Sequence, residues 1–307
     1  MIEILTSLLA SGVSLATPLL LAALGEIIME KSGVINIALE GIMLVAAFFA
    51  MYVALTTGSP VLGLVAAVLA ALLFASLFAL LCVGVQADQI IVGAGLNILA
   101  FGLTGVLLRS IFGLTGAAIT APTFSPLSVP VLAHLPILGP ALFKQNVLVY
   151  LAFLLIPITW LLLARTRFGL NLRAGGENPT AADAAGLPVT RLRCAAIMLG
   201  SGYCGLAGAY LAIAQANTFV EGMTAGRGFI ALAIVIFAGW HPTGAALVAL
   251  LFGIASALQF QFQALDLKIP YQFFLMLPYI LTIVVAALYR GRAKAPAAMA
   301  KSYFREG

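Results

Sequence analysis

Long uninterrupted runs of apolar residues, separated by short polar stretches, make up most of the chain. The runs lack the strict alternation of apolar and polar positions that marks a half-buried strand, so they predict helices. Several runs reach the roughly 20 residues that a helix needs to cross the hydrocarbon core of a bilayer. The predicted spans cover residues 6–24, 34–55, 61–85, 90–111, 145–164, 194–214, 228–240, 243–262 and 271–289. The seventh of these, 228–240, is too short to cross the bilayer unaided.

The composition agrees with a protein embedded in lipid. Of the 307 residues, 63% are hydrophobic and only 8% are charged, whereas soluble domains carry about 25% charged residues. The chain therefore lacks the polar surface needed to face water on all sides, and we expect an integral membrane protein. The predicted fold is all-α: one polytopic transmembrane helical bundle over residues 1–307, with about nine spans.

Positive charge is concentrated in two segments, which predicts the orientation of the chain. The loop 165–193 contains five arginines, and the tail 290–307 contains five further basic residues. The long segment 112–144 contains one lysine, at its far end. Because cytoplasmic segments of membrane proteins are enriched in lysine and arginine, we expect the loop and the tail to be cytoplasmic and the N-terminus to lie outside. The net charge of +5 is explained in this way and does not indicate a nucleic-acid partner.

Two stretches, 25–44 and 217–245, place ionisable side chains inside this apolar pattern. Charged groups are costly in lipid, so they usually face a cavity, a partner or a polar pathway. The alternative is that these groups form hydrogen bonds between packed helices or lie at the membrane interface. The strongest candidates for a substrate pathway are Glu26, Glu30, Asn36, Glu40, Glu221 and Arg227, and weaker ones are Asn97, Gln215 and Asn217.

Glycines accompany the ionisable residues in both stretches and allow the helices to break there. A broken helix exposes backbone polar groups toward a cavity, which is a common way to build a transport site. We therefore expect breaks near Gly25, Gly33, Gly41, Gly222, Gly226 and Gly228.

The basic loop contains a short sequence, ENPTAADAAGLP, that predicts a helix with its own start and stop. Asn178 can cap the first turn, and Pro179 suits the first helical position. Gly186 can adopt the left-handed conformation that ends a helix, and Pro188 prevents continuation. A helix of about seven residues is not stable alone, so it must rest on this protein or on a partner. A simple connector is the alternative.

Residues that carry enzymatic chemistry are not evident. The chain has no Gly-Lys-Ser/Thr sequence of a phosphate-binding loop, so it is not expected to hydrolyse ATP itself. His134 and His241 have no second ligand at metal spacing. Ser201 lies between glycines, but the surrounding sequence lacks the spacing of an intramembrane serine protease. We expect no metal, no cofactor bound by this chain, and no enzymatic activity.

Four segments together carry a resemblance to a known family. They are GEIIMEKSGVINIALEGIMLVAA, QADQIIVGAGLNILAFGLTG, RAGGENPTAADAAGLPV and GRGFIALAIVIFAGWHPTGAALVALLFG. In this order they resemble the simple-sugar and nucleoside permeases of ABC transporters, in the ribose and branched-chain amino acid permease superfamily, and most closely the nucleoside type. The segments run from about residue 20 to residue 255, so the resemblance covers most of the chain.

The resemblance implies a type II importer fold with broken helices in a bacterial-type cytoplasmic membrane. It implies three partners: a cytoplasmic ABC ATPase with two cassettes that binds the ATP, a second related permease, and an extracytoplasmic nucleoside- or sugar-binding protein. The pathway signature then includes Glu26, Gly33, Asn36, Glu40, Gly41, Gly226, Gly228 and Trp240. The loop that couples to the ATPase includes Glu177, Asn178, Ala182, Asp183 and Gly186.

Other functions also agree with the sequence. An ion-coupled secondary transporter would use the carboxylates of the spans for protons and would need no ATPase. Within the importer class, ribose or a related sugar is an alternative substrate, since the sequence does not distinguish a nucleoside pocket from a sugar pocket. The sequence also does not distinguish a homodimer from a heterodimer of permeases.

Overall fold

The computed structural model describes residues 2–113, 120–128, 138–264 and 295–303, together with five positions between 276 and 287. Apart from those five positions, the predicted ninth span, 271–289, lies outside the described ranges, as does His134. The remaining eight predicted spans lie within the described ranges.

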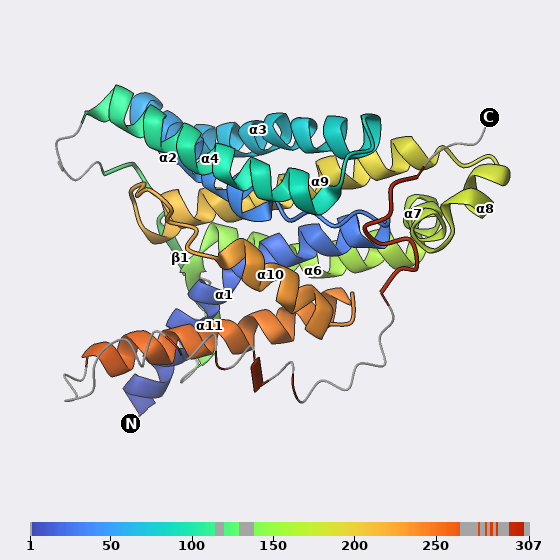
Figure 1. Cartoon of the computed structure of the whole chain (residues 1–307). Coiled ribbons are helices and arrows are strands. Elements are labelled where there is room, and N and C mark those ends of the chain that lie inside the picture. The colour runs from blue at the N-terminus through green and yellow to red at the C-terminus, as the bar shows by residue number, and fades with distance from the viewer. Residues whose placement is uncertain are drawn as a thin grey trace.

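Seven helices of the described residues are long and apolar enough to cross a membrane. An all-α, multi-pass bundle is thereby confirmed (Figure 1). Two of the seven end in a π-helical turn. The helices are α1 (Ile2–Lys31), α2 (Leu39–Thr57), α3 (Pro60–Ala79, extended by η1, Leu80–Gly84), α4 (Gln89–Phe112), α6 (Val147–Arg165), α9 (Val189–Tyr210, extended by η3, Leu211–Gln215) and α11 (Pro242–Ala264).

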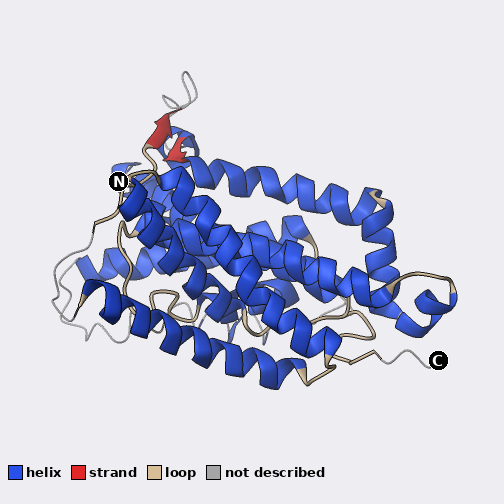
Figure 2. Cartoon of the chain, turned by 90° about the horizontal axis from the view of Figure 1, so that it is seen from above, coloured by secondary structure: helices blue, strands red, loops and turns tan. Residues whose placement is uncertain are grey.

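The other elements are short. Helix α10 (Arg227–Phe237) has 11 residues, which confirms that the seventh apolar run does not span on its own. Two three-residue strands, β1 (Pro126–Ser128) and β2 (Lys144–Asn146), pair antiparallel beside α5 (Leu138–Phe143). Helices α7 (Arg167–Glu177) and α8 (Pro179–Ala184) lie at the opposite end of the bundle from the strands (Figure 2).

Helix α1 forms the centre of the bundle, where it packs against α9, α10 and α11. Leu21, Leu24 and Ile27 have no exposed surface. Glycine permits the closest approaches: a Cβ atom at Gly25 would collide with the carbonyl oxygen of Gly200 on α9, and the reverse substitution would collide with Gly25. Small residues at such contacts let helix backbones approach closely in lipid.

The position of Gly25 corrects one prediction. The predicted first span ends at residue 24 with a break at Gly25, but α1 continues through it to Lys31. Gly41 likewise lies within α2 and not at a break, because its missing side chain makes room for Asn97 and Ala100 of α4. These two glycines serve helix packing. Breaks do occur at Gly33, Gly222 and Gly226, whose φ angles are +88°, +68° and +82°.

The C-terminal segment 295–303 lies at the same end of the bundle as α7 and α8. The N-terminal end of α1 lies at the opposite end (Figure 1). The predicted loop 165–193 is more ordered than expected, because its first part forms α7. Thr166 begins that helix, since its hydroxyl accepts a hydrogen bond from the Gly169 N–H at 3.0 Å.

Candidate functional site

The loop between α1 and α2, residues 32–38, folds back onto α1 through a buried carboxylate. Glu26 accepts a hydrogen bond from the backbone N–H of Asn36 at 2.9 Å. The side chain of Asn36 in turn accepts one from the Ala38 N–H at 3.0 Å. Both Glu26 and Asn36 have no exposed surface. The two predicted pathway residues thus meet, and together they satisfy backbone groups of a non-helical loop inside the protein.

Asn97 fixes the other side of this loop. Its side-chain oxygen accepts a hydrogen bond from the Gly41 N–H at 2.8 Å, and its side-chain nitrogen donates to the Ile37 carbonyl at 2.9 Å. Asn97 lies eight residues after the start of α4 at Gln89, which is about 12 Å along the helix axis. Helix α2 therefore begins well inside the layer that the long helices span.

Glu40 of α2 caps the N-terminus of α10. Its two carboxylate oxygens accept hydrogen bonds from the backbone N–H groups of Gly226 and Gly228, both at 2.7 Å. The first N–H groups of a helix have no partner within it and carry partial positive charge, so a carboxylate there is favourable. Because lipid offers no hydrogen bonds, a helix end at this depth requires such a partner.

The other end of α10 is held by a second carboxylate. The indole N–H of Trp240 donates a hydrogen bond to Glu30 of α1. Trp240 is 6% exposed and has a φ angle of +57°, an unusual conformation for a large residue. The Lys31 ammonium lies 6.0 Å from the centre of the indole ring. Helix α10 is therefore attached at its start to α2 and beyond its end to α1.

The segment 216–226 and α10 together form a broken span. The carbonyl of Asn217 accepts a hydrogen bond from the Ala121 N–H at 3.0 Å, next to the end of α9. Further along, the Arg227 guanidinium donates to the carbonyl of Met223 at 2.8 Å and to that of Thr224 at 3.2 Å. The predicted break in this stretch is thus present, and the positively charged side chain is used for local backbone contacts.

Glu221 does not join the other carboxylates. It forms a two-pronged ion pair with Arg109 of α4, in which both N···O distances are 3.0 Å. Arg109 lies twelve residues beyond Asn97 on α4, which is about 18 Å along the helix. Glu221 therefore lies at a different depth from Asn97 and the start of α2. Arg109 was not among the predicted residues, although a single arginine near the end of an apolar helix is a visible signal.

The predicted short helix in the basic loop is confirmed as α8. The Asn178 side chain accepts a hydrogen bond from the Ala181 N–H at 3.0 Å, and Pro179 is the first helical residue. At the other end, the N–H groups of Gly186 and Leu187 donate to the carbonyls of Asp183 and Ala182, at 2.8 and 3.0 Å. This pair of bonds, with φ +82° at Gly186, is a Schellman cap.

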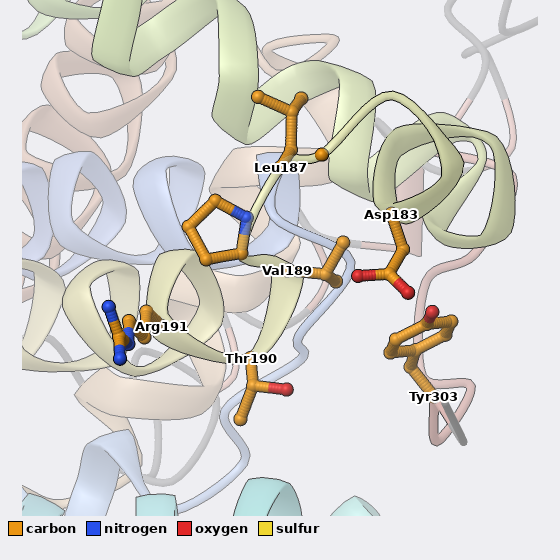
Figure 3. A pocket seen from close by; sticks show the side chains of 8 residues that line it. Asp183, Leu187, Val189, Thr190, Arg191 and Tyr303 are labelled. Atoms are coloured by element: carbon orange, nitrogen blue, oxygen red, sulfur yellow. The ribbon is translucent and has the colours of Figure 1, made fainter. Parts of the chain in front are cut away.

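A cavity of about 340 Å³ lies between α8, the start of α9 and the C-terminal segment. In Figure 3 the side chains of Asp183 and Tyr303 point toward one another across it. Ala182, on the same helix, is 5% exposed, so this part of α8 rests on the protein itself. The predicted coupling residues Glu177, Asn178 and Asp183 all belong to this end of the bundle. Among the described residues, no group of three or more histidines, cysteines and carboxylates could hold a metal ion.

The chain matches known permeases over most of its length. The family model described as "Branched-chain amino acid transport system / permease component" matches residues 8–286. A guanosine ABC transporter permease of Bacillus subtilis, NupQ, is 37% identical, and the alignment covers 99% of this chain and 98% of that protein. A nucleoside ABC transporter permease of Lactococcus lactis, NupC, is 36% identical with the same coverage.

A putative glucose ABC transporter permease of Haloferax volcanii, TsgC13, is 39% identical, over 85% of this chain and 79% of that protein. No solved structure matches the chain. The family match and the full-length relatives agree with the bundle of membrane-spanning helices described above. The chain therefore belongs to the branched-chain amino acid transport system permease family, and it is a multi-pass membrane subunit of an ABC transporter of the sugar and nucleoside kind, not an enzyme.

Proposed function

We propose that this chain is the permease subunit of an ATP-driven importer for purine or other nucleosides. The observation that supports this substrate class best is the match, nearly end to end, to a guanosine permease and a nucleoside permease. The glucose permease is as similar but aligns over less of the chain, so ribose or a related sugar is the second candidate.

The proposed transport path runs beside the broken span formed by 216–226 and α10. Helix α10 is held by carboxylates of α1 and α2, so a shift of these helices would move α10 with them. Such a shift would expose the break first to one side of the membrane and then to the other. In this scheme the start of α2 is held in place by Glu26, Asn36 and Asn97. The start of α10 is held in place by Glu40.

The proposed driving force is ATP hydrolysis by a separate cytoplasmic ATPase with two cassettes, which would contact α7 and α8. Helix α8 supports this role. It has only six residues, but both of its ends are capped, so it keeps a defined shape at the end of the bundle despite its short length. A second related permease and an extracytoplasmic binding protein would complete the transporter. In this proposal α7, α8 and the tail 290–307 lie on the cytoplasmic side, the N-terminus lies outside, and residues 1–307 form one permease domain.

Uptake by intact cells tests the proposal. Radiolabelled adenosine and guanosine would be supplied to the native cell with and without this gene, with unlabelled ribose or glucose as competitor. We expect uptake that requires the gene, ends on ATP depletion and is not reduced by the sugars. Uptake that is lost with the gene but is reduced by ribose would indicate ribose or a related sugar as the substrate. Uptake that persists without ATP and collapses with a protonophore would instead indicate an ion-coupled carrier.

A further inference from the structure

The C-terminal segment 295–303 is hydrogen-bonded to four elements that are far apart in sequence. The Ala298 N–H donates to the Gly176 carbonyl of α7 at 3.0 Å, and the Ala300 N–H donates to the Gly33 carbonyl at 3.1 Å. The Lys301 carbonyl accepts a hydrogen bond from Arg193 of α9 at 2.9 Å. The Tyr303 carbonyl accepts one from the side chain of Gln86, between α3 and α4, at 2.8 Å. We call residues 295–303 the tail strap.

Tight backbone packing surrounds two of these bonds. A Cβ atom at Gly33 would lie 3.0 Å from the guanidinium of Arg193 and 3.1 Å from the Ala298 carbonyl oxygen. A Cβ atom at Gly176 would collide with the carbonyl oxygen of Lys31 and lie 3.1 Å from the Gly33 nitrogen. Ala298 is itself 5% exposed. The backbones at the end of α1, at Gly33 and at the end of α7 therefore approach one another closely, and the tail strap packs against Gly33.

Arg193 adds a buried charge to this junction. Arg193 is 4% exposed. Burying a guanidinium costs free energy unless hydrogen bonds within the protein replace those it made with water. The Nη1 of Arg193 donates a hydrogen bond to the Lys301 carbonyl at 2.9 Å, whereas its buried Nε and Nη2 have no hydrogen-bond partner among the described residues. The Lys301 carbonyl of the tail strap thus offsets part of the cost of burying Arg193. The same hydrogen bond holds the strap against α9.

These contacts connect α7 and α8 to the broken span. Gly33 belongs to the loop whose next residues are fixed by Glu26, and that loop leads into α2, whose Glu40 caps α10. The strap joins this loop to Gly176 near the end of α7, two residues before Asn178, which caps α8. Tyr303 extends the contact to the cavity beside Asp183 (Figure 3).

We infer that the tail strap is a positioning element that makes α7 and α8 move together with the α1–α2 loop, so that movement at the ATPase side reaches α10. This inference rests on the proposed function. It assigns positioning roles to the backbone N–H groups of Ala298 and Ala300 and to Arg193.

Position 300 allows a matched test. Ala300 has an exposed side chain and a φ angle of +59°, and its contribution to the strap is a backbone N–H. Ala300→Pro removes that N–H and cannot adopt positive φ, whereas Ala300→Gly keeps the N–H and suits the conformation. Lys301→Ala is a second control, because the hydrogen bonds from Arg193 and to Ala298 use only the main chain of Lys301.

Hydrogen–deuterium exchange of the purified full transporter is measured first. In Ala300→Pro we expect faster exchange in residues 32–38 and 179–187, with the long helices as protected as in Ala300→Gly. Uptake of guanosine and ATP hydrolysis are then measured in proteoliposomes. We expect Ala300→Pro to consume at least about fivefold more ATP per guanosine transported, the lower end of typical coupling effects, and the two controls to match the wild type.

The outcomes separate the strap from the proposed function. Equal exchange and an equal ATP-to-guanosine ratio in Ala300→Pro and Ala300→Gly would overturn the inference. Loss of ATPase assembly in Ala300→Pro would also overturn it, since the strap would then be a docking element. If the wild-type transporter shows no ATP-driven uptake of guanosine or adenosine, the proposed function fails, and the exchange data still decide whether the strap orders both segments.

Discussion

The carboxylate of Glu40 accepts a hydrogen bond from the backbone N–H of Gly228, a residue 188 positions further along the chain. With the equivalent bond to Gly226, it gives the start of α10 a negatively charged partner. The sequence identifies Glu40 only as a polar residue in an apolar stretch. The structure shows that Glu40 accepts the hydrogen bonds of N–H groups that have no partner within their own helix.

Glu40→Ala is expected to destabilise the start of α10. It leaves two N–H groups without their acceptor, and loss of a helix cap or of a hydrogen bond to a charged group costs about 1–3 kcal/mol. The thermal unfolding midpoint of the purified protein should fall, and guanosine uptake should fall with it. Glu40→Gln, which keeps one acceptor oxygen, should show a smaller loss. Identical midpoints for the alanine variant and the wild type would contradict the capping role.

Gly228→Ala tests the same junction from the other side. A Cβ atom at Gly228 would lie 2.5 Å from the Glu40 nitrogen and 2.7 Å from its Cα, and these backbone atoms cannot move aside easily. Overpacking of this kind typically costs about 1–3 kcal/mol. The control is Gly102→Ala on α4, a helical glycine where an added Cβ would meet no atom within 4 Å. A drop in melting midpoint for both variants alike would mean that crowding at Glu40 is not the cause.

The local features of this protein were predictable because their signals are local. Asn178, Pro179 and Gly186 specify both ends of α8 through contacts of three to five residues. The short apolar run at α10 could likewise be recognised by counting. Glycine was harder to interpret, since the sequence gives the same residue for two purposes: Gly33 supplies a positive φ angle, and Gly25 supplies room for α9.

The long-range contacts could not be predicted from the sequence. The tail strap binds through backbone N–H and carbonyl groups, which every residue has, so Ala298 and Ala300 carry no sequence signal. The partner of Glu221 was missed because the sequence does not place Arg109 beside it. Helix α7 was missed because its glycines lower helix propensity, whereas in the fold those positions are the contact surface with α6 and α1.

Trp240→Phe should uncouple the far end of α10 from α1. The substitution keeps most of the aromatic ring and removes the N–H that bonds Glu30. Loss of a donor to a buried acceptor costs about 1–3 kcal/mol. A double-mutant cycle with Glu30→Ala, which removes the acceptor, is read by thermal unfolding and should give a non-zero coupling energy. Trp160→Phe on α6, a partly exposed indole near Arg165, is the control. Additive effects of the Trp240 and Glu30 changes would show that the bond contributes nothing.

Gly186→Ala should impair coupling without disturbing the spans. Gly186 has φ +82°, and no atom lies within 4 Å of a Cβ at this position. The effect of alanine is therefore confined to backbone strain, about 1–2 kcal/mol for a left-handed residue. Asparagine tolerates this conformation better, so Gly186→Asn is the matched control. We expect the alanine variant to hydrolyse ATP with reduced guanosine uptake in proteoliposomes and to keep the melting midpoint of the spans. Full uptake by the alanine variant would mean that α8 is a connector, and the function proposed for this end of the bundle would have to be abandoned.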